Sequence, residues 1–237
     1  MNRSWRLASF ALPAALLVTP VLADTQASAS TSTTSILSAA KTALANQKGV
    51  HLAVSVKQGS TTTLEVADLG TTTGIESIIS GSAKATVEVA PAFGYMQGDS
   101  SGLTSLIGLT AAEAKKLGSK WMSLKSGTTP YSDLKTSATI LAVRDLLPAA
   151  KGTTSSIETI GGTKLYVLKW TSAATSSAPK LSNVLSISMG TTLLPVKETV
   201  SDSTASETTE FTKWGENVVV HAPAGAATIP YTTIVGK

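Results

Sequence analysis

Hydrophobic and polar residues alternate along much of this chain, and the alternation predicts two sets of short β-strands. Val50, Leu52, Val54 and Val56 share one face of a strand, because successive side chains point to opposite faces. Similar short runs with turn residues between them predict two antiparallel meanders. The first meander covers residues 50–56, 64–69, 75–79, 85–89 and 93–96, and the second covers residues 157–160, 164–170, 185–189, 194–200, 206–211 and 217–221.

Apolar residues at helical spacing predict helices before and between the meanders. The spacing predicts a helix over residues 34–47 and another that carries Leu103, Leu106 and Ile107. Residues 111–117 form a third, because Thr110 and Glu113 make a capping box and a glycine follows. A fourth apolar stripe covers residues 140–147, whereas 126–130 is expected to be a loop.

The predicted order is helix, meander, helices, meander, which indicates an α+β fold. A sheet of nine to eleven strands reaches the size at which open sheets curl. Curling gives a concave face that the helices can cover, and a closed barrel lined by the same residues is the other possible form. Either form favours an apolar cavity. The candidate pocket residues are the inward-facing apolar ones: Val54, Val56, Leu64, Val87, Val89, Leu106, Ile107, Leu185, Ile187 and Met189.

The first residues are typical of a secretory signal peptide. Two arginines precede an apolar run over residues 7–18, and Val21-Leu22-Ala23 is a small-residue cleavage site. We therefore expect a signal peptide at 1–23, a flexible Ser/Thr-rich leader at 24–34, a single domain at 35–222 and an irregular tail at 223–237. The protein is expected to be exported, to the periplasm, the cell envelope or the exterior.

Charge and cysteine content exclude several classes of function. The net charge is 19 − 15 = +4, and loss of Arg3 and Arg6 with the signal leaves 17 − 15 = +2. No basic cluster with interleaved aromatic residues occurs, so nucleic acid is not an expected partner. The chain has no cysteine, which excludes disulfides, thiolate metal sites and a cysteine nucleophile.

The sequence offers no catalytic motif. His51 and His221 are isolated and predicted to lie on polar strand faces, and two histidines make a metal site only if distant carboxylates join them. Glu198, Asp202, Glu207 and Glu210 are predicted to mark the exterior of one hairpin, although a paired-acid glycosidase site stays open. Trp121, Tyr131, Trp170 and Trp214 could stack on a sugar or lipid headgroup, or anchor strand ends in the core.

Three segments carry a resemblance to a known family. They are Tyr95-Met96-Gln97-Gly98, Gly118-Ser119-Lys120-Trp121-Met122, and Leu194-Pro195-Val196-Lys197 followed by F-x-x-W-G-x-x-V-x-V-x-x-P from Phe211 to Pro223. The chain resembles the LolA/LolB-like superfamily, nearest the actinobacterial LppX/LprG-type cell-envelope lipoproteins. The resemblance implies a strongly curved antiparallel half-barrel with helices over its concave face. It departs from the family at the cleavage site, where Ala23 meets Asp24 instead of a cysteine, so no lipid anchor is expected.

The same resemblance implies a carrier without covalent chemistry. We expect a non-enzymatic protein that binds and transports an acyl-chain ligand (lipid, glycolipid or lipoprotein), acts as a monomer and needs no cofactor or metal. The membrane surface is a second partner that the sequence leaves open. The alternative is an envelope interaction or structural module whose cavity is filled by its own side chains, and a secreted hydrolase ranks last.

Overall fold

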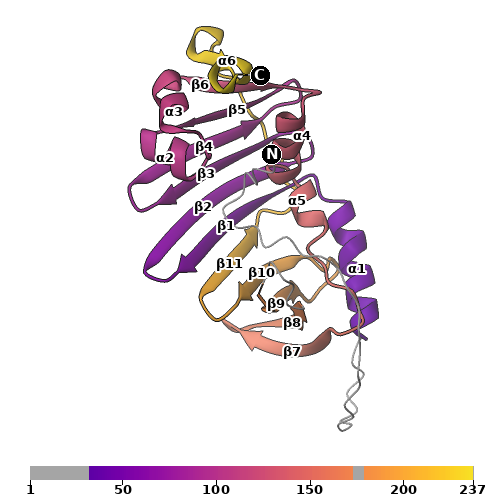
Figure 1. Ribbon diagram of the computed structural model, residues 1–237. Helices are drawn as coiled ribbons and strands as arrows, with labels where there is room; N and C mark the ends of the chain where they lie inside the picture. Colours follow the sequence, from indigo (N-terminus) through magenta and orange to yellow (C-terminus); the bar gives the residue numbers. More distant parts are fainter. Residues whose placement is uncertain (1–31, 173–178, 237) are drawn as a thin grey trace.

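The computed structural model describes residues 32–172 and 179–236, and one large curled sheet dominates this part of the chain (Figure 1). The sheet has 12 strands in the order β12-β6-β5-β4-β3-β2-β1-β11-β10-β9-β8-β7. Every neighbouring pair is antiparallel except β12 and β6, which run parallel. The predicted α+β class is confirmed, whereas the count of nine to eleven strands and the wholly antiparallel pairing are wrong.

The two meanders lie side by side in this sheet. The first comprises β1 (Gly49–Gln58), β2 (Thr61–Gly70), β3 (Gly74–Ser80), β4 (Ala83–Val89), β5 (Phe93–Gly98) and β6 (Trp121–Lys125). The second comprises β7 (Thr154–Ile160), β8 (Thr163–Ser172), β9 (Leu181–Ser188), β10 (Pro195–Ser201) and β11 (Ala205–Thr212).

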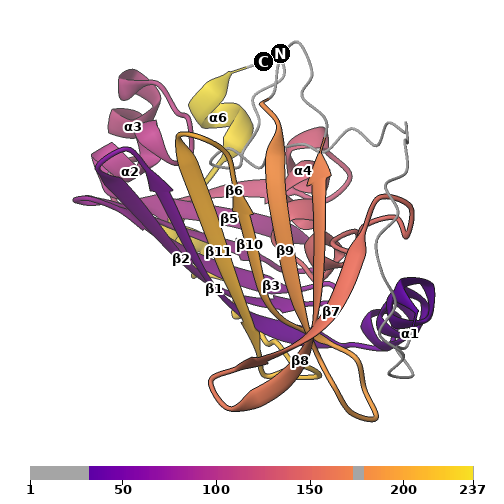
Figure 2. The same ribbon diagram turned by 90° about the horizontal axis from the view of Figure 1, so that it is seen from below.

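Pairing of β1 with β11 joins the meanders into one sheet. Val54 of β1 lies opposite Thr209 of β11 on one side and opposite Glu65 of β2 on the other. The first strand of the first meander, β1, and the last strand of the second meander, β11, therefore meet in the middle of the sheet. Figure 2 shows the long strands of the curled sheet. Strong curling is what a sheet of more than ten strands is expected to show.

The helices pack on one face of the sheet, which we call the covered face and which carries Val50, Leu52 and Val54. Three hydrophobic clusters join this face to the helices. The helices are α1 (Thr33–Ala45), α2 (Ser100–Ser105), α3 (Ala111–Leu117), α4 (Thr129–Ser137), α5 (Leu141–Arg144) and α6 (Tyr231–Val235). The largest cluster joins strands β3 to β6 with α2, α3, α4 and α6, and it includes Leu103, Leu117 and Leu134.

Several local predictions are confirmed. Thr110 and Glu113 form the reciprocal capping box of α3, and α3 has the predicted bounds. Asp99 caps α2 by accepting the Gly102 amide at 2.6 Å. Gly161 and Gly162 both have positive φ, 57° and 81°, in the turn between β7 and β8, as a type I′ turn requires.

The C-terminal part differs from the prediction. Residues 217–221 form no strand, because residues 213–227 run as a connection from β11 to the far edge of the sheet; we call this connection the strap. The tail after 223 is not wholly irregular: β12 (Thr228–Pro230) pairs with β6, and Ile234 of α6 is buried. These elements are too short to show a period in the sequence, and contacts with the sheet fix them instead.

Helix α4 is a second difference, since residues 126–130 were expected to be a loop. Its sequence contains only two buried residues, Tyr131 and Leu134, so it carries no clear apolar stripe. Pro130 fits the first turn of a helix, where its missing N–H is harmless.

The predicted signal peptide lies outside the described residues, and α1 begins at Thr33, so only residues 24–31 of the predicted leader stay untested. None of the described helices has the length and apolar character needed to cross a membrane.

Candidate functional site

A cavity of about 140 Å³ lies between the covered face and helices α4 and α5. Its floor follows three consecutive levels of the sheet, because the strand register aligns the inward-facing residues. Each level is a row of residues that lie opposite one another on neighbouring strands. The first row from β11 to β5 contains Phe211, Leu52, Glu76, Val87 and Met96, and the second row from β10 to β3 contains Glu198, Thr209, Val54, Glu65 and Ile78. The third row, on β11, β1 and β2, contains Glu207, Val56 and Thr63.

The roof of the cavity is apolar with one exception. Helix α4 contributes Leu134 and Ser137. Helix α5 contributes Ala142 and Val143, and Leu146 lies two residues after the end of α5. Helices α4 and α5 leave space above these strand positions, whereas α2 and α3 pack closely on the neighbouring strands. Ile107, just after α2, closes that side of the cavity.

Four glutamates give the cavity wall an acidic character that the sequence pattern did not predict: Glu65, Glu76, Glu198 and Glu207. Glu198 lies opposite Thr209, so it is the diagonal neighbour of Glu207 across β10 and β11. Burial, followed by the negative charge of Glu207, raises the pKa of Glu198 to about 8. At neutral pH this carboxyl is therefore mostly protonated and can donate a hydrogen bond.

The prediction that Glu198 and Glu207 lie on the hairpin exterior is wrong. Only Glu210 and Asp202 of that group face away from the cavity: Glu210 pairs with Lys197 at 3.3 Å, and Asp202 accepts the amides of the turn at Thr204 and Ala205. These turn hydrogen bonds lower the pKa of Asp202.

The structure brings four of the ten candidate pocket residues into the cavity wall: Val54, Val56, Val87 and Ile107. The others lie elsewhere. Val89 and Leu106 are buried in the largest packed cluster, which α2, α3 and α4 share, and Leu185 and Ile187 are buried against α1. Leu64 and Met189 are 50% and 38% exposed. Leu64 lies opposite Ser55, so it points to the face away from Val54.

The aromatic residues that were weighed as ligand platforms act mainly as anchors. The Tyr131 hydroxyl donates to the carbonyl oxygens of Ala90 and Pro91, both at 3.0 Å. The Trp214 indole donates to the Pro195 carbonyl at 2.9 Å and stacks on Phe211. A buried tyrosine or tryptophan usually finds such a partner for its polar end.

Comparison with known proteins gives a likeness of structure alone. No protein-family model and no curated protein matches the chain. Among solved structures, lipoprotein LppX of Mycobacterium tuberculosis is 15% identical at a TM-score of 0.48, covering 79% of this chain and 99% of LppX. LprF from Mycobacterium bovis is 14% identical at a TM-score of 0.49, covering 81% of this chain and 97% of LprF. LppX is one of the proteins that give their names to the family that the sequence resembles.

Proposed function

We propose that the protein is a non-enzymatic carrier that binds an acyl chain or similar apolar ligand in the cavity under α4 and α5. The observation that carries the proposal is the cavity itself, which lies between the covered face and two short helices and has apolar side chains on both walls. In this proposal the covered face is the concave side of a half-barrel, and the helices form its lid.

The volume of the cavity limits the ligand. An apolar cavity of about 150 Å³ is known to hold a molecule of benzene size, and pockets for larger ligands span roughly 300–1,000 Å³. At about 140 Å³ the cavity takes a segment of one chain, and a two-chain lipid needs outward movement of α4 and α5. Each buried methylene contributes about 0.8 kcal/mol, so even a segment of several carbons gives measurable affinity.

The glutamates in the wall also restrict the ligand. A carboxylate or phosphate group inside the cavity would face the negative charge of Glu207 next to the half-buried, mostly protonated Glu198. An anionic headgroup therefore stays at the mouth, and the buried part is the chain or a neutral polar group that accepts a hydrogen bond from Glu198.

The test is ligand content and uptake. Organic extraction and mass spectrometry of the purified protein should give an acyl-chain compound, and a fluorescent fatty acid should bind with saturation. Val54→Phe should abolish uptake by filling the cavity. Ala53→Phe is the matched control, because Ala53 is the next residue of β1 and is exposed on the opposite face.

The alternative, an envelope interaction or structural module without a ligand, is favoured by one observation, the small size of the cavity beside the fully packed cluster under α2 and α3. Extracts without lipid, together with no uptake by the unmodified protein, would overturn the carrier proposal and leave this alternative.

Location and assembly are part of the same proposal. The signal-like start of the sequence supports export, and we propose that the protein diffuses as a monomer in the periplasm, envelope or exterior without a lipid anchor. Cell fractionation and N-terminal sequencing of the exported form test this location, and cleavage after Ala23 is the expected result.

A further inference from the structure

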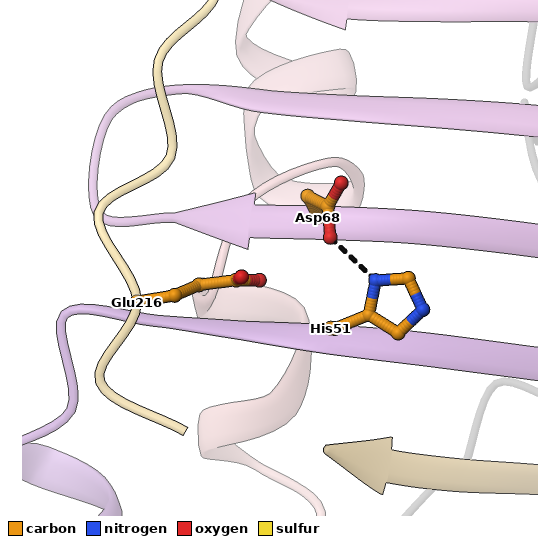
Figure 3. Close-up of side chains that lie close together, drawn as sticks. All are labelled: His51, Asp68 and Glu216. Carbon is orange, nitrogen blue, oxygen red and sulfur yellow. Dashed lines mark hydrogen bonds and ion pairs between the residues drawn. The ribbon is translucent and has the colours of Figure 1, made fainter. Parts of the chain in front are cut away.

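Three metal-ligating side chains meet on the face of the sheet opposite the helices, far from one another in sequence. His51 lies on β1, Asp68 lies opposite it on β2, and Glu216 reaches them from the strap (Figure 3). One ligand atom from each residue lies within 4.8 Å of the others. An isolated histidine can form a metal site only if carboxylates from elsewhere in the chain join it. Asp68 and Glu216 join His51 in this way.

The backbone holds this cluster in place before any ion binds. The Gly215 amide donates to the Gly49 carbonyl at 2.8 Å, and the Thr73 hydroxyl donates to the Val218 carbonyl at 2.7 Å. A Cβ atom at Gly49 would lie 2.5 Å from the Glu216 carbonyl oxygen, so only glycine lets the strap approach the sheet this closely. Glu216 is thus positioned by contacts on both sides of it.

An ion pair alone does not account for the cluster. His51 Nδ1 and Asp68 Oδ1 lie 2.5 Å apart, and this pair satisfies both groups. Glu216 adds a second carboxyl group beside Asp68; burial, then the charge of Asp68 and a side-chain hydrogen bond with it, raise the pKa of Glu216, and its Oε1 atom is buried without a hydrogen-bond partner among the described residues. A buried polar atom in that state is costly unless something satisfies it, and a cation would do so.

The ligand types indicate which cation fits. One imidazole and two carboxylates suit a borderline transition-metal ion, because Mg²⁺ and Ca²⁺ prefer oxygen ligands only. Ligand bonds to zinc are about 2.0–2.2 Å long, so the His51–Asp68 pair must open slightly to admit the ion between its atoms.

We propose that His51, Asp68 and Glu216 form a site for a divalent transition-metal ion of the Zn²⁺ type, which fastens the strap to strands β1 and β2. Water completes the coordination, since three protein ligands leave one position of a tetrahedral ion open. Binding requires a neutral imidazole and ionised carboxylates, so it releases any proton that these groups carry. The site lies on the other face of the sheet from the cavity and does not depend on the proposed carrier function.

The test uses the full exported protein without a histidine tag, stripped with a chelator and titrated with ZnCl₂. Competition with a chromophoric chelator should show one Zn²⁺ per chain, and the melting temperature should rise on binding. His51→Ala and Glu216→Gln should each weaken binding by about tenfold or more, because loss of even an outer-shell partner of a metal ligand commonly costs that much. The matched control is His221→Ala, because His221 is the other histidine, is exposed and lies outside the cluster.

Three results would overturn the proposal: no stoichiometric binding of Zn²⁺, unchanged affinity in His51→Ala, or a loss in His221→Ala equal to that in His51→Ala. Equal stabilisation by MgCl₂ would overturn the assignment to transition metals. Glu216→Gln keeps the size of the side chain, so it still gives an answer if His51→Ala fails to fold. Loss of zinc binding with lipid uptake unchanged is the expected pattern, and it separates this site from the cavity.

Discussion

The packed region under α2 and α3 and the cavity under α5 and the C-terminal half of α4 lie on the same face of the same sheet, yet one is solid and the other hollow. The packed cluster that α2 and α3 join includes Ala85, Met122 and Leu124, all buried, and Leu134 of α4 belongs to it as well. Over the cavity the strands present Val54 and Val56 beside threonines and glutamates.

The difference shows that a sheet of this curvature does not by itself make a cavity. Helix α2 approaches β4 closely because Gly102 has no side chain, so Leu103 and its neighbours fill the space completely. Over the cavity, the polar and β-branched side chains of β1, β2 and β11 do not fill the space below α5 and the C-terminal half of α4. The hollow is therefore set by the side chains of a few strand positions.

The largest expected effect is a difference in the free energy of unfolding between leucine-to-alanine variants in the two regions. Leu103→Ala should lower the free energy of unfolding by about 3–5 kcal/mol, because Leu103 is 1% exposed in the solid region and its removal opens a new void. Leu146→Ala should cost about 1–2 kcal/mol, since Leu146 is half-buried beside existing space. Urea unfolding followed by circular dichroism measures both, and equal losses would contradict the contrast.

Glu198→Gln is expected to stabilise the protein at high pH. The folded-state pKa of Glu198 is raised from 4.5 to about 8, so folding binds a proton between these values and stability falls as pH rises through them. The variant should match the unmodified protein near pH 4.5 and exceed it by roughly 2–4 kcal/mol at pH 9.

The control for this prediction is Glu210→Gln, on the exposed side of the same hairpin. It should change the pH profile of the melting temperature little. A Glu198→Gln profile that runs parallel to that of the unmodified protein would show that this carboxyl is not buried with a neighbouring charge.

Gly102→Ala probes how tightly the solid region is closed. The new Cβ would lie 1.9 Å from the Lys84 carbonyl oxygen, so α2 must move away from β4. We expect a loss of about 1–3 kcal/mol, as for other overpacked sites. Gly190→Ala is the control, because a Cβ there meets no atom within 4 Å and the melting temperature should stay nearly constant.

The smallest expected effect is on the free energy of unfolding when the residue before the first turn of α3 or of α4 is replaced. Thr110→Ala removes the capping box of α3 and should cost about 1 kcal/mol. Thr128→Ala should cost less, because Thr128 precedes α4 without a side-chain capping bond. Thermal unfolding at one pH tests the order, and a larger loss for Thr128→Ala would reverse it.

Much of the fold is predictable from the sequence where local chemistry decides. Helix α3 follows from Thr110, Glu113 and the glycine after it, and the β7–β8 hairpin follows from Gly161-Gly162. Helix α4 and the segment around β12 were not predictable in the same way, because contacts with the rest of the chain stabilise them.

The cavity wall was harder to predict, since it depends on register between strands. In β2 the apolar residues Leu64 and Val66 are exposed, and the polar residues Thr63 and Glu65 face the cavity. Alternation alone assigns the apolar set to the interior, and a shift of one residue reverses the assignment. The pairing of Leu64 with Ser55 settles the face, and no single strand contains that information.

The parallel pairing of β12 with β6 also decides how one molecule can meet another. Strand β12 occupies part of one margin of the sheet, so the backbone groups of β6 next to it are already bonded. The opposite margin is β7, where Ile157 and Ile160 are 54% and 45% exposed. The longer open edge for self-association by adding strands is therefore β7, with seven residues against three in β12, and the Glu158–Lys169 ion pair lies next to those isoleucines as a charge that disfavours such pairing.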